Sequence, residues 1–144
     1  MSAHKMIATL FFLFLIGISG TVCAQTFSSL PESERNAKLI EVAKYVYKNP
    51  RWENFYREYG TPEIESFVIE GGGKEKNTKS KYFGTDLGSL IYVVIFRYDK
   101  TKESMDWDYA AKVYISDKGG FAYAIALGNG MILKTYEMNK NPVR

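Results

Sequence analysis

At 144 residues the chain is long enough for one domain, and its formal net charge of +3 is too balanced for a nucleic-acid-binding protein. It has one histidine and one cysteine, His4 and Cys23, and both lie within the first 24 residues. The remaining chain therefore excludes Ser-His-Asp and Cys-His catalysis, disulfides and the zinc sites that use imidazole or thiolate ligands. We expect no enzymatic activity, no metal and no cofactor.

The first 24 residues have the three-part pattern of a secretory signal peptide. Lys5 supplies a positive charge, an apolar run follows from Met6 to Ile18, and small residues surround Ala24. The run is shorter than the roughly 20 residues that cross a bilayer, so we expect no membrane span. Val22 precedes Cys23, which disfavours lipid attachment there, and we predict cleavage after Ala24. Residues 25–144 then form a single small exported domain. Because it lacks disulfides, we place it in the periplasm or outside a bacterial cell.

Two helices are predicted at the start of this domain. Ser29-Leu-Pro-Glu32 fits a capping box for a helix that runs to about Lys48. Leu39, Val42, Ala43 and Val46 recur at helical spacing and predict its buried stripe.

Asn49-Pro50 predicts the end of that helix and the start of the next. The second helix should run to Gly60, with a buried aromatic stripe of Trp52, Phe55, Tyr56 and Tyr59.

The join Tyr59-Gly60-Thr61-Pro62 between this helix and the next strand is similar to one in small periplasmic domains of the SmpA/BamE type, which are outer-membrane assembly lipoproteins. The similarity covers about residues 36–70. The chain departs from that type because it lacks a good lipid-attachment motif and has additional strands. The resemblance implies architecture only, and no residue role is carried over.

Five strand-like segments follow, and tight glycine turns at Asp117-Lys-Gly-Gly120 and Gly128-Asn-Gly130 separate the last three. They span residues 64–70, 89–98, 107–116, 121–127 and 131–137, and a polar loop at 71–86 separates the first two. Helices followed by strands in one short chain indicate the α+β class. We predict two N-terminal helices packed on one face of a roughly five-stranded antiparallel meander sheet.

Alternation along the strands predicts which residues share a face of the sheet. The helix-covered face should include Trp107, Val113, Phe121, Tyr123 and Ile125. The opposite face should carry Ile91, Val93, Ile95, Ala110, Lys112, Tyr114, Ala122, Ala124 and Ala126. A face so poor in charge requires cover by the 71–86 loop, by a second copy or by a partner protein.

Two charged segments are candidate sites. The loop carries Lys74, Lys76, Lys79 and Lys81, followed by Tyr82 and Phe83, and is a candidate basic finger for an anionic surface. Its Gly71-Gly72-Gly73-Lys74 lacks the spacing of a phosphate-binding loop. Glu103, Asp106 and Asp108 cluster around a predicted turn and strand start and are candidates for carboxylate acid–base chemistry.

Three functions remain open. The first is an exported non-catalytic binding protein that engages another protein, or itself, through the apolar sheet face and the basic loop. Its site residues are Ala110, Tyr114, Ala122, Ala124 and Ala126 on the face, and Lys74, Lys76, Lys79 and Lys81 on the loop. The second is a small-ligand carrier with a tyrosine-lined pocket between helices and sheet. The third is a carboxylate-dependent hydrolase.

Overall fold

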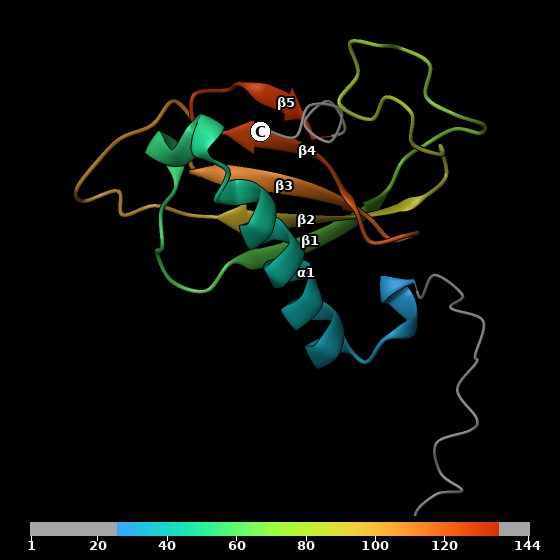
Figure 1. Ribbon diagram of the computed structural model, residues 1–144, viewed down its shortest axis with the longest axis horizontal. Coiled ribbons are helices and arrows are strands. Elements are labelled where there is room, and N and C mark those ends of the chain that lie inside the picture. Colours follow the sequence, from blue (N-terminus) through green and yellow to red (C-terminus); the bar gives the residue numbers. More distant parts are fainter. Residues whose placement is uncertain (1–25, 136–144) are drawn as a thin grey trace, which may run out of the picture.

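A computed structural model describes residues 26–135 of the chain (Figure 1). The predicted signal peptide, residues 1–24, and the end of the last predicted strand lie outside the described residues. Between residues 26 and 135, no helix is long and apolar enough to cross a membrane.

Helix α1 spans Glu32–Tyr47, after a short 3-10 turn, η2, at Phe27–Ser29. Glu32 and Glu34 in its first turn and Lys44 in its last suit the helix dipole. Leu39 and Ala43 of the predicted stripe are buried, Val42 and Val46 are partly buried against the same core, and Tyr47 joins them as a fully buried residue. The predicted capping box does not form: Pro31 is the N-cap, and the Ser29 hydroxyl donates to the Thr26 carbonyl instead, at 2.7 Å.

The second predicted helix is a shorter 3-10 helix, η3, at Pro50–Phe55. Asn49 caps its start by accepting a hydrogen bond from the Arg51 backbone N–H. Trp52 leaves helical geometry, at φ −136° and ψ 29°, and its indole N–H donates to the Val46 carbonyl at 3.1 Å. The predicted continuation to Gly60 is therefore wrong, and Tyr59 is exposed rather than part of a buried stripe.

The strands form one antiparallel sheet in sequence order, as predicted. They are β1 (Glu63–Val68), β2 (Leu90–Phe96), β3 (Ala111–Ser116), β4 (Ala122–Leu127) and β5 (Ile132–Lys134). Helix α1 crosses one face of this sheet and packs on β2, β3 and β4 (Figure 1). The α+β class and the meander are confirmed.

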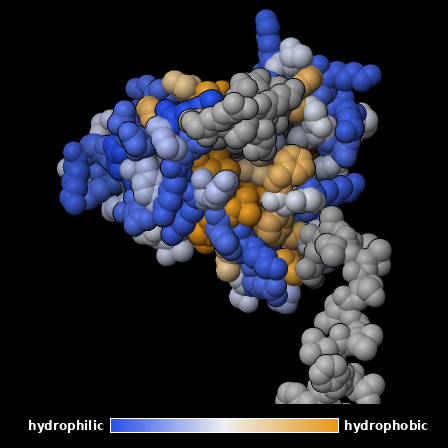
Figure 2. All heavy atoms as spheres, in the orientation of Figure 1, coloured by the Kyte–Doolittle hydropathy of each residue, from blue (hydrophilic) through white to orange (hydrophobic). Residues whose placement is uncertain are grey.

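Apolar side chains fill both faces of the sheet. On the helix face, Leu39, Ala43 and Tyr47 of α1 pack with Val94, Val113 and Ile125 of the strands. Viewed from this side, apolar residues gather at the centre with hydrophilic residues around them (Figure 2). The second face carries its own buried cluster, which includes Ile91, Ile95, Tyr114, Tyr123 and Ala124. It is covered by the loop between β1 and β2, called here the 69–89 loop, through Ile69, Tyr82 and Leu87.

A β-bulge in β4 changes the predicted alternation. Tyr114 pairs with Ala124, but the next residue, Ile115, pairs with Ala122, so Tyr123 has no partner in the ladder. Tyr123 and Ala124 consequently both contribute to the second face, and Ala122 packs on the helix face. The predicted faces of Tyr123 and Ala122 are therefore wrong.

Irregular backbone at the strand ends corrects three further assignments. Strand β3 starts at Ala111, so alternation does not extend to Trp107, which is 54% exposed. Ala110 donates its backbone N–H to the Phe96 carbonyl and is buried on the helix face rather than the second face. Phe121 precedes β4 and is 55% exposed instead of lying in the core.

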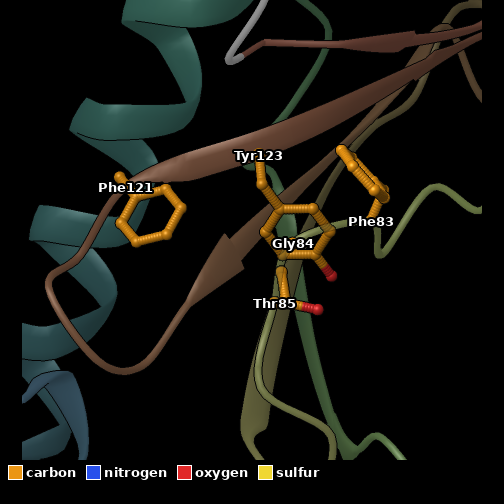
Figure 3. A pocket seen from close by; sticks show the side chains of 5 residues that line it. All are labelled: Phe83, Gly84, Thr85, Phe121 and Tyr123. Carbon is orange, nitrogen blue, oxygen red and sulfur yellow. The ribbon is translucent and has the colours of Figure 1, made fainter. Parts of the chain in front are cut away.

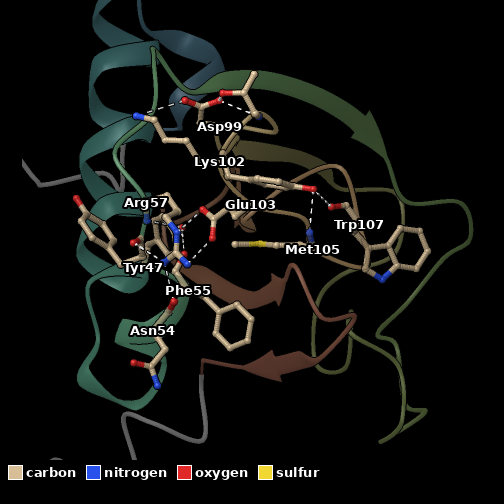
Figure 4. A network of polar contacts seen from close by, with 12 residues as sticks. Tyr47, Asn54, Phe55, Arg57, Asp99, Lys102, Glu103, Met105 and Trp107 are labelled. Carbon is tan, nitrogen blue, oxygen red and sulfur yellow. Dashed lines mark hydrogen bonds and ion pairs between the residues drawn. The ribbon is translucent and has the colours of Figure 1, made fainter.

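A polar network ties the end of α1 to the segment between β2 and β3 (Figure 4). The buried Tyr47 hydroxyl donates to the Phe55 carbonyl and accepts from the Arg57 backbone N–H. Arg57 binds both carboxylate oxygens of Glu103, at 2.6 and 2.8 Å. Burial raises the pKa of Tyr47 to about 12, so this hydroxyl keeps its proton and its role as a donor.

Candidate functional site

The 69–89 loop has defined internal structure rather than the open form of a flexible finger. Two backbone hydrogen bonds join Glu75 to its far side, from the Glu75 N–H to the Thr85 carbonyl and from the Gly84 N–H back to Glu75. Leu87 donates to the Gly73 carbonyl at 2.7 Å, and Lys74 and Asp86 form an isolated β-bridge. These bonds fold the loop back on itself, so that its apolar residues reach the second face of the sheet.

Three tyrosines meet where the loop contacts the sheet. The Tyr82 ring lies 6.4 Å from Tyr114 and 6.1 Å from Tyr123, and Tyr114 and Tyr123 lie 6.2 Å apart. The Lys81 ammonium sits over Tyr114, 4.6 Å from the ring centroid, and 5.0 Å from that of Tyr82. Edge-to-face and cation–π contacts of this kind hold the loop against β3 and β4.

Tyr123 carries a buried hydroxyl without a partner. The residue is 3% exposed, and within the described part of the chain its hydroxyl oxygen has no hydrogen bond. Burial raises the pKa of Tyr123 well above its ordinary range, so the phenol stays protonated. An unmade hydrogen bond in such a place costs about 1–3 kcal/mol. The unpaired hydroxyl therefore belongs to the bulge residue, which also helps to line a surface pocket.

An open aromatic pocket lies between the loop and the start of β4 (Figure 3). Its volume is about 160 Å³, and it is lined by Phe83, Gly84, Thr85, Phe121 and Tyr123. In Figure 3 the rings of Phe121 and Phe83 stand on either side of Tyr123, and Thr85 lies on the side of the Tyr123 hydroxyl. Gly84 has a positive φ of 81° with open space where a Cβ would point, so its backbone leaves the floor of the pocket clear.

Lys134 of β5 stands next to one wall of this pocket. It pairs with Ala124 in the β4–β5 ladder, directly after Tyr123, which places it on the second face. Its ammonium group donates to the Thr78 carbonyl and lies 5.0 Å from the centroid of the Phe83 ring. One lysine therefore bridges β5, the loop and the pocket wall.

The residues predicted for the apolar face end up in two places. Tyr114, Ala124 and Ala126 lie together on the second face, buried beneath the 69–89 loop. Ala110 and Ala122 lie on the helix face, as described above. The 69–89 loop covers Tyr114, Ala124 and Ala126, and Ala110 and Ala122 pack in the core on the helix face, so the five residues do not form one exposed contact surface.

The four loop lysines also separate. Lys81 is fixed on the tyrosine rings, close to the sheet. Lys74, Lys76 and Lys79 are exposed, and their side chains form no hydrogen bond or ion pair with the other residues of 26–135. The predicted basic character of the loop is therefore carried by these three exposed lysines.

Two of the three acids proposed for hydrolysis are engaged by arginines, and the third, Asp106, is exposed. Glu103 is held by Arg57, and Asp108 accepts from Arg97 at 2.8 Å. The Arg57 guanidinium keeps the pKa of Glu103 below its usual value. Such an arrangement is typical of structural ion pairs. Across residues 26–135, no three Asp, Glu, His or Cys side chains gather as a metal-binding group.

The pocket does not follow from the sequence pattern. Tyr82 and Phe83 stand out in the sequence only as neighbours of the lysines, and the length of the loop indicates a role. Alternation places Phe121 and Tyr123, however, in the core of the helix face. The predicted carrier pocket lies between helices and sheet, whereas the observed pocket lies on the loop side. The bulge at Tyr123 places that residue on the loop side of the sheet, and no sequence pattern predicts this bulge.

Comparison of the chain with protein-family models, with curated proteins and with solved structures finds no match. The chemistry of the site therefore rests on its own residues and geometry.

Proposed function

We propose that the protein is a non-catalytic binding protein whose recognition site is the pocket between Phe83, Phe121 and Tyr123. The observation that supports this most strongly is the convergence of three aromatic rings, from two distant segments, around one open hollow. Phe121 is 55% exposed at the pocket mouth, and apolar hollows with aromatic walls are typical of ligand sites.

The size of the pocket limits what it holds. A void of about 160 Å³ is close to the engineered cavity of about 150 Å³ that accommodates benzene in another protein. One aromatic ring therefore fills it, either as a side chain of a partner protein or as a small molecule. This revises our first hypothesis, because a partner meets the loop and the pocket instead of a bare sheet face.

The chemistry of the lining favours binding over catalysis. The five residues carry no carboxylate, imidazole, thiol or amine. Their only polar side-chain groups are hydroxyls: Thr85 donates its proton to the Tyr82 carbonyl, and Tyr123 is held neutral by burial. Neither is activated by a neighbouring base, which nucleophilic catalysis requires.

Export remains part of the proposal. The signal-peptide pattern predicts a native protein that begins at Gln25 and carries no lipid. Intact-mass measurement of the protein purified from its native envelope is expected to give the mass of residues 25–144. A diacylglyceryl group on Cys23, or a chain that still begins at Met1, contradicts this part of the proposal.

Ring binding is tested with a single-ring probe such as 2-phenylethanol, titrated by NMR against the wild type and Phe121→Ala. Removing one of three aromatic walls is expected to weaken binding about three- to tenfold. Since Phe121 is half exposed, unfolding free energy should change by less than about 1 kcal/mol.

Tyr45→Ala is the matched control, because Tyr45 is 85% exposed on α1 and belongs to the opposite side of the sheet. It should leave ring binding unchanged. The proposed site is contradicted if the NMR chemical-shift changes lie away from Phe83, Thr85 and Tyr123. It is also contradicted if Phe121→Ala and wild type bind the probe equally well.

A further inference from the structure

We propose that the ring bound in this pocket carries a carboxylate, and that the ammonium group of Lys134 binds it. The inference rests on the proposed function and names the ligand class for the same site: an aromatic acid. Its source is either a small molecule or the C-terminal aromatic residue of a peptide, and both present the same ring and anion.

The position of Lys134 carries the first part of the inference. Its β-ladder partner, Ala124, directly follows the pocket residue Tyr123, and its ammonium rests on the ring of the pocket residue Phe83. An ammonium group has three donors, and the Thr78 carbonyl accepts one of them. A cation with donors to spare therefore lies against Phe83, one wall of the aromatic hollow, which suits a ring with an attached anion.

The surrounding charge supplies the second part. The 69–89 loop contains four lysines and three carboxylates, Glu70, Glu75 and Asp86. Glu75 accepts from the Asn77 backbone N–H at 2.8 Å. The pocket lining adds no acid of its own. The net positive loop favours approach of an anion and disfavours a cationic ring.

The structure also explains why Lys134, rather than Lys81, is the partner. Lys81 is already placed between two tyrosines and lies 3.4 Å from the Tyr114 hydroxyl. Neither lysine is itself part of the pocket lining, but their neighbours differ. Lys81 contacts Tyr82 and Tyr114, which lie outside the lining. Lys134 contacts Phe83, which belongs to the lining, so its charge is the one that a ligand seated on Phe83 meets.

The test compares three probes by calorimetric or NMR titration of the purified protein. They are phenylacetate, its neutral counterpart 2-phenylethanol, and acetate, which has the anion without the ring. Phenylacetate should bind at least about tenfold more tightly than 2-phenylethanol, and its affinity should fall as ionic strength rises, because a charge-assisted bond is added. Acetate should bind far more weakly than either, since it fills none of the aromatic hollow.

Lys134→Gln should remove the advantage of phenylacetate and leave the affinity for 2-phenylethanol within about twofold. Lys112→Gln is the matched control: Lys112 rests on the Tyr109 ring at 4.7 Å, on β3, away from the pocket lining. It should change neither affinity. Equal affinities of wild type for phenylacetate and 2-phenylethanol overturn this inference while the ring site stands. Failure of every ring to bind wild type overturns the proposed function itself.

A tripeptide ending in phenylalanine, with a free or an amidated C-terminus, distinguishes the two sources. If the tripeptide with a free C-terminus binds more tightly than phenylacetate, and amidation abolishes this binding, the ligand is a chain terminus. Binding of phenylacetate with no binding of the peptide supports a small aromatic acid. Equal binding of the free and amidated peptides contradicts the role of the carboxylate.

Discussion

Replacing Trp52 by alanine is expected to lower the free energy of unfolding by about 3–5 kcal/mol, the range for deleting a buried aromatic side chain. Trp52 is 4% exposed and belongs to the core cluster of the helix face. Its indole N–H also donates to the Val46 carbonyl, near the end of α1. The substitution therefore removes core volume and the contact that fixes η3 against α1. Denaturant unfolding measures the change.

Trp107→Ala is the matched control, because the chain has two tryptophans in opposite environments. Trp107 is 54% exposed and stacks on Tyr109 with 6.1 Å between ring centroids. Its loss should cost no more than about 1.5 kcal/mol, the upper range for such a pair. If both variants lose a similar amount of unfolding free energy, Trp107 must lie in the core, which would contradict the observed start of β3.

Replacing Ala124 by lysine is expected to destabilise the protein by at least about 3 kcal/mol. Ala124 is fully buried between β3 and β5, beneath the 69–89 loop. A lysine there overpacks a closed layer and places an ammonium group among apolar and tyrosine side chains. A fall in melting temperature of about 10 °C or more is expected for a domain of this size.

The same variant separates two explanations of the apolar second face. If the 69–89 loop covers the face, stability falls and the oligomeric state of the remaining folded protein stays that of the parent. Glu65→Lys is the control: it adds a lysine at an exposed position of edge strand β1 and should change stability by less than about 0.5 kcal/mol. An Ala124→Lys protein with parental stability that loses association with a partner or second copy would support a bare docking face instead.

Sequence periodicity by itself determined the α+β class, α1, the five strands and their meander order. These follow from local patterns: residues of α1 repeat at helical spacing, β2 is an unbroken apolar run, and glycines lie in three of the four connections between strands. The absence of histidine and cysteine after residue 24 also limits the chemistry that the chain can perform, whatever its fold. Such properties depend on residue type and on near neighbours in the chain.

The tertiary structure decided which residues face one another. The bulge at Tyr123 moved it to the second face, and Trp52 left helical geometry inside a helix, η3, that ends at Phe55. Folding of the 69–89 loop onto the sheet brought Phe83 to Tyr123 and Lys134 to Phe83. The contacts of Phe83 with Tyr123 and Lys134 join residues about 40–50 positions apart, and no local pattern records their energies. The pocket and its adjacent cation are therefore products of the fold.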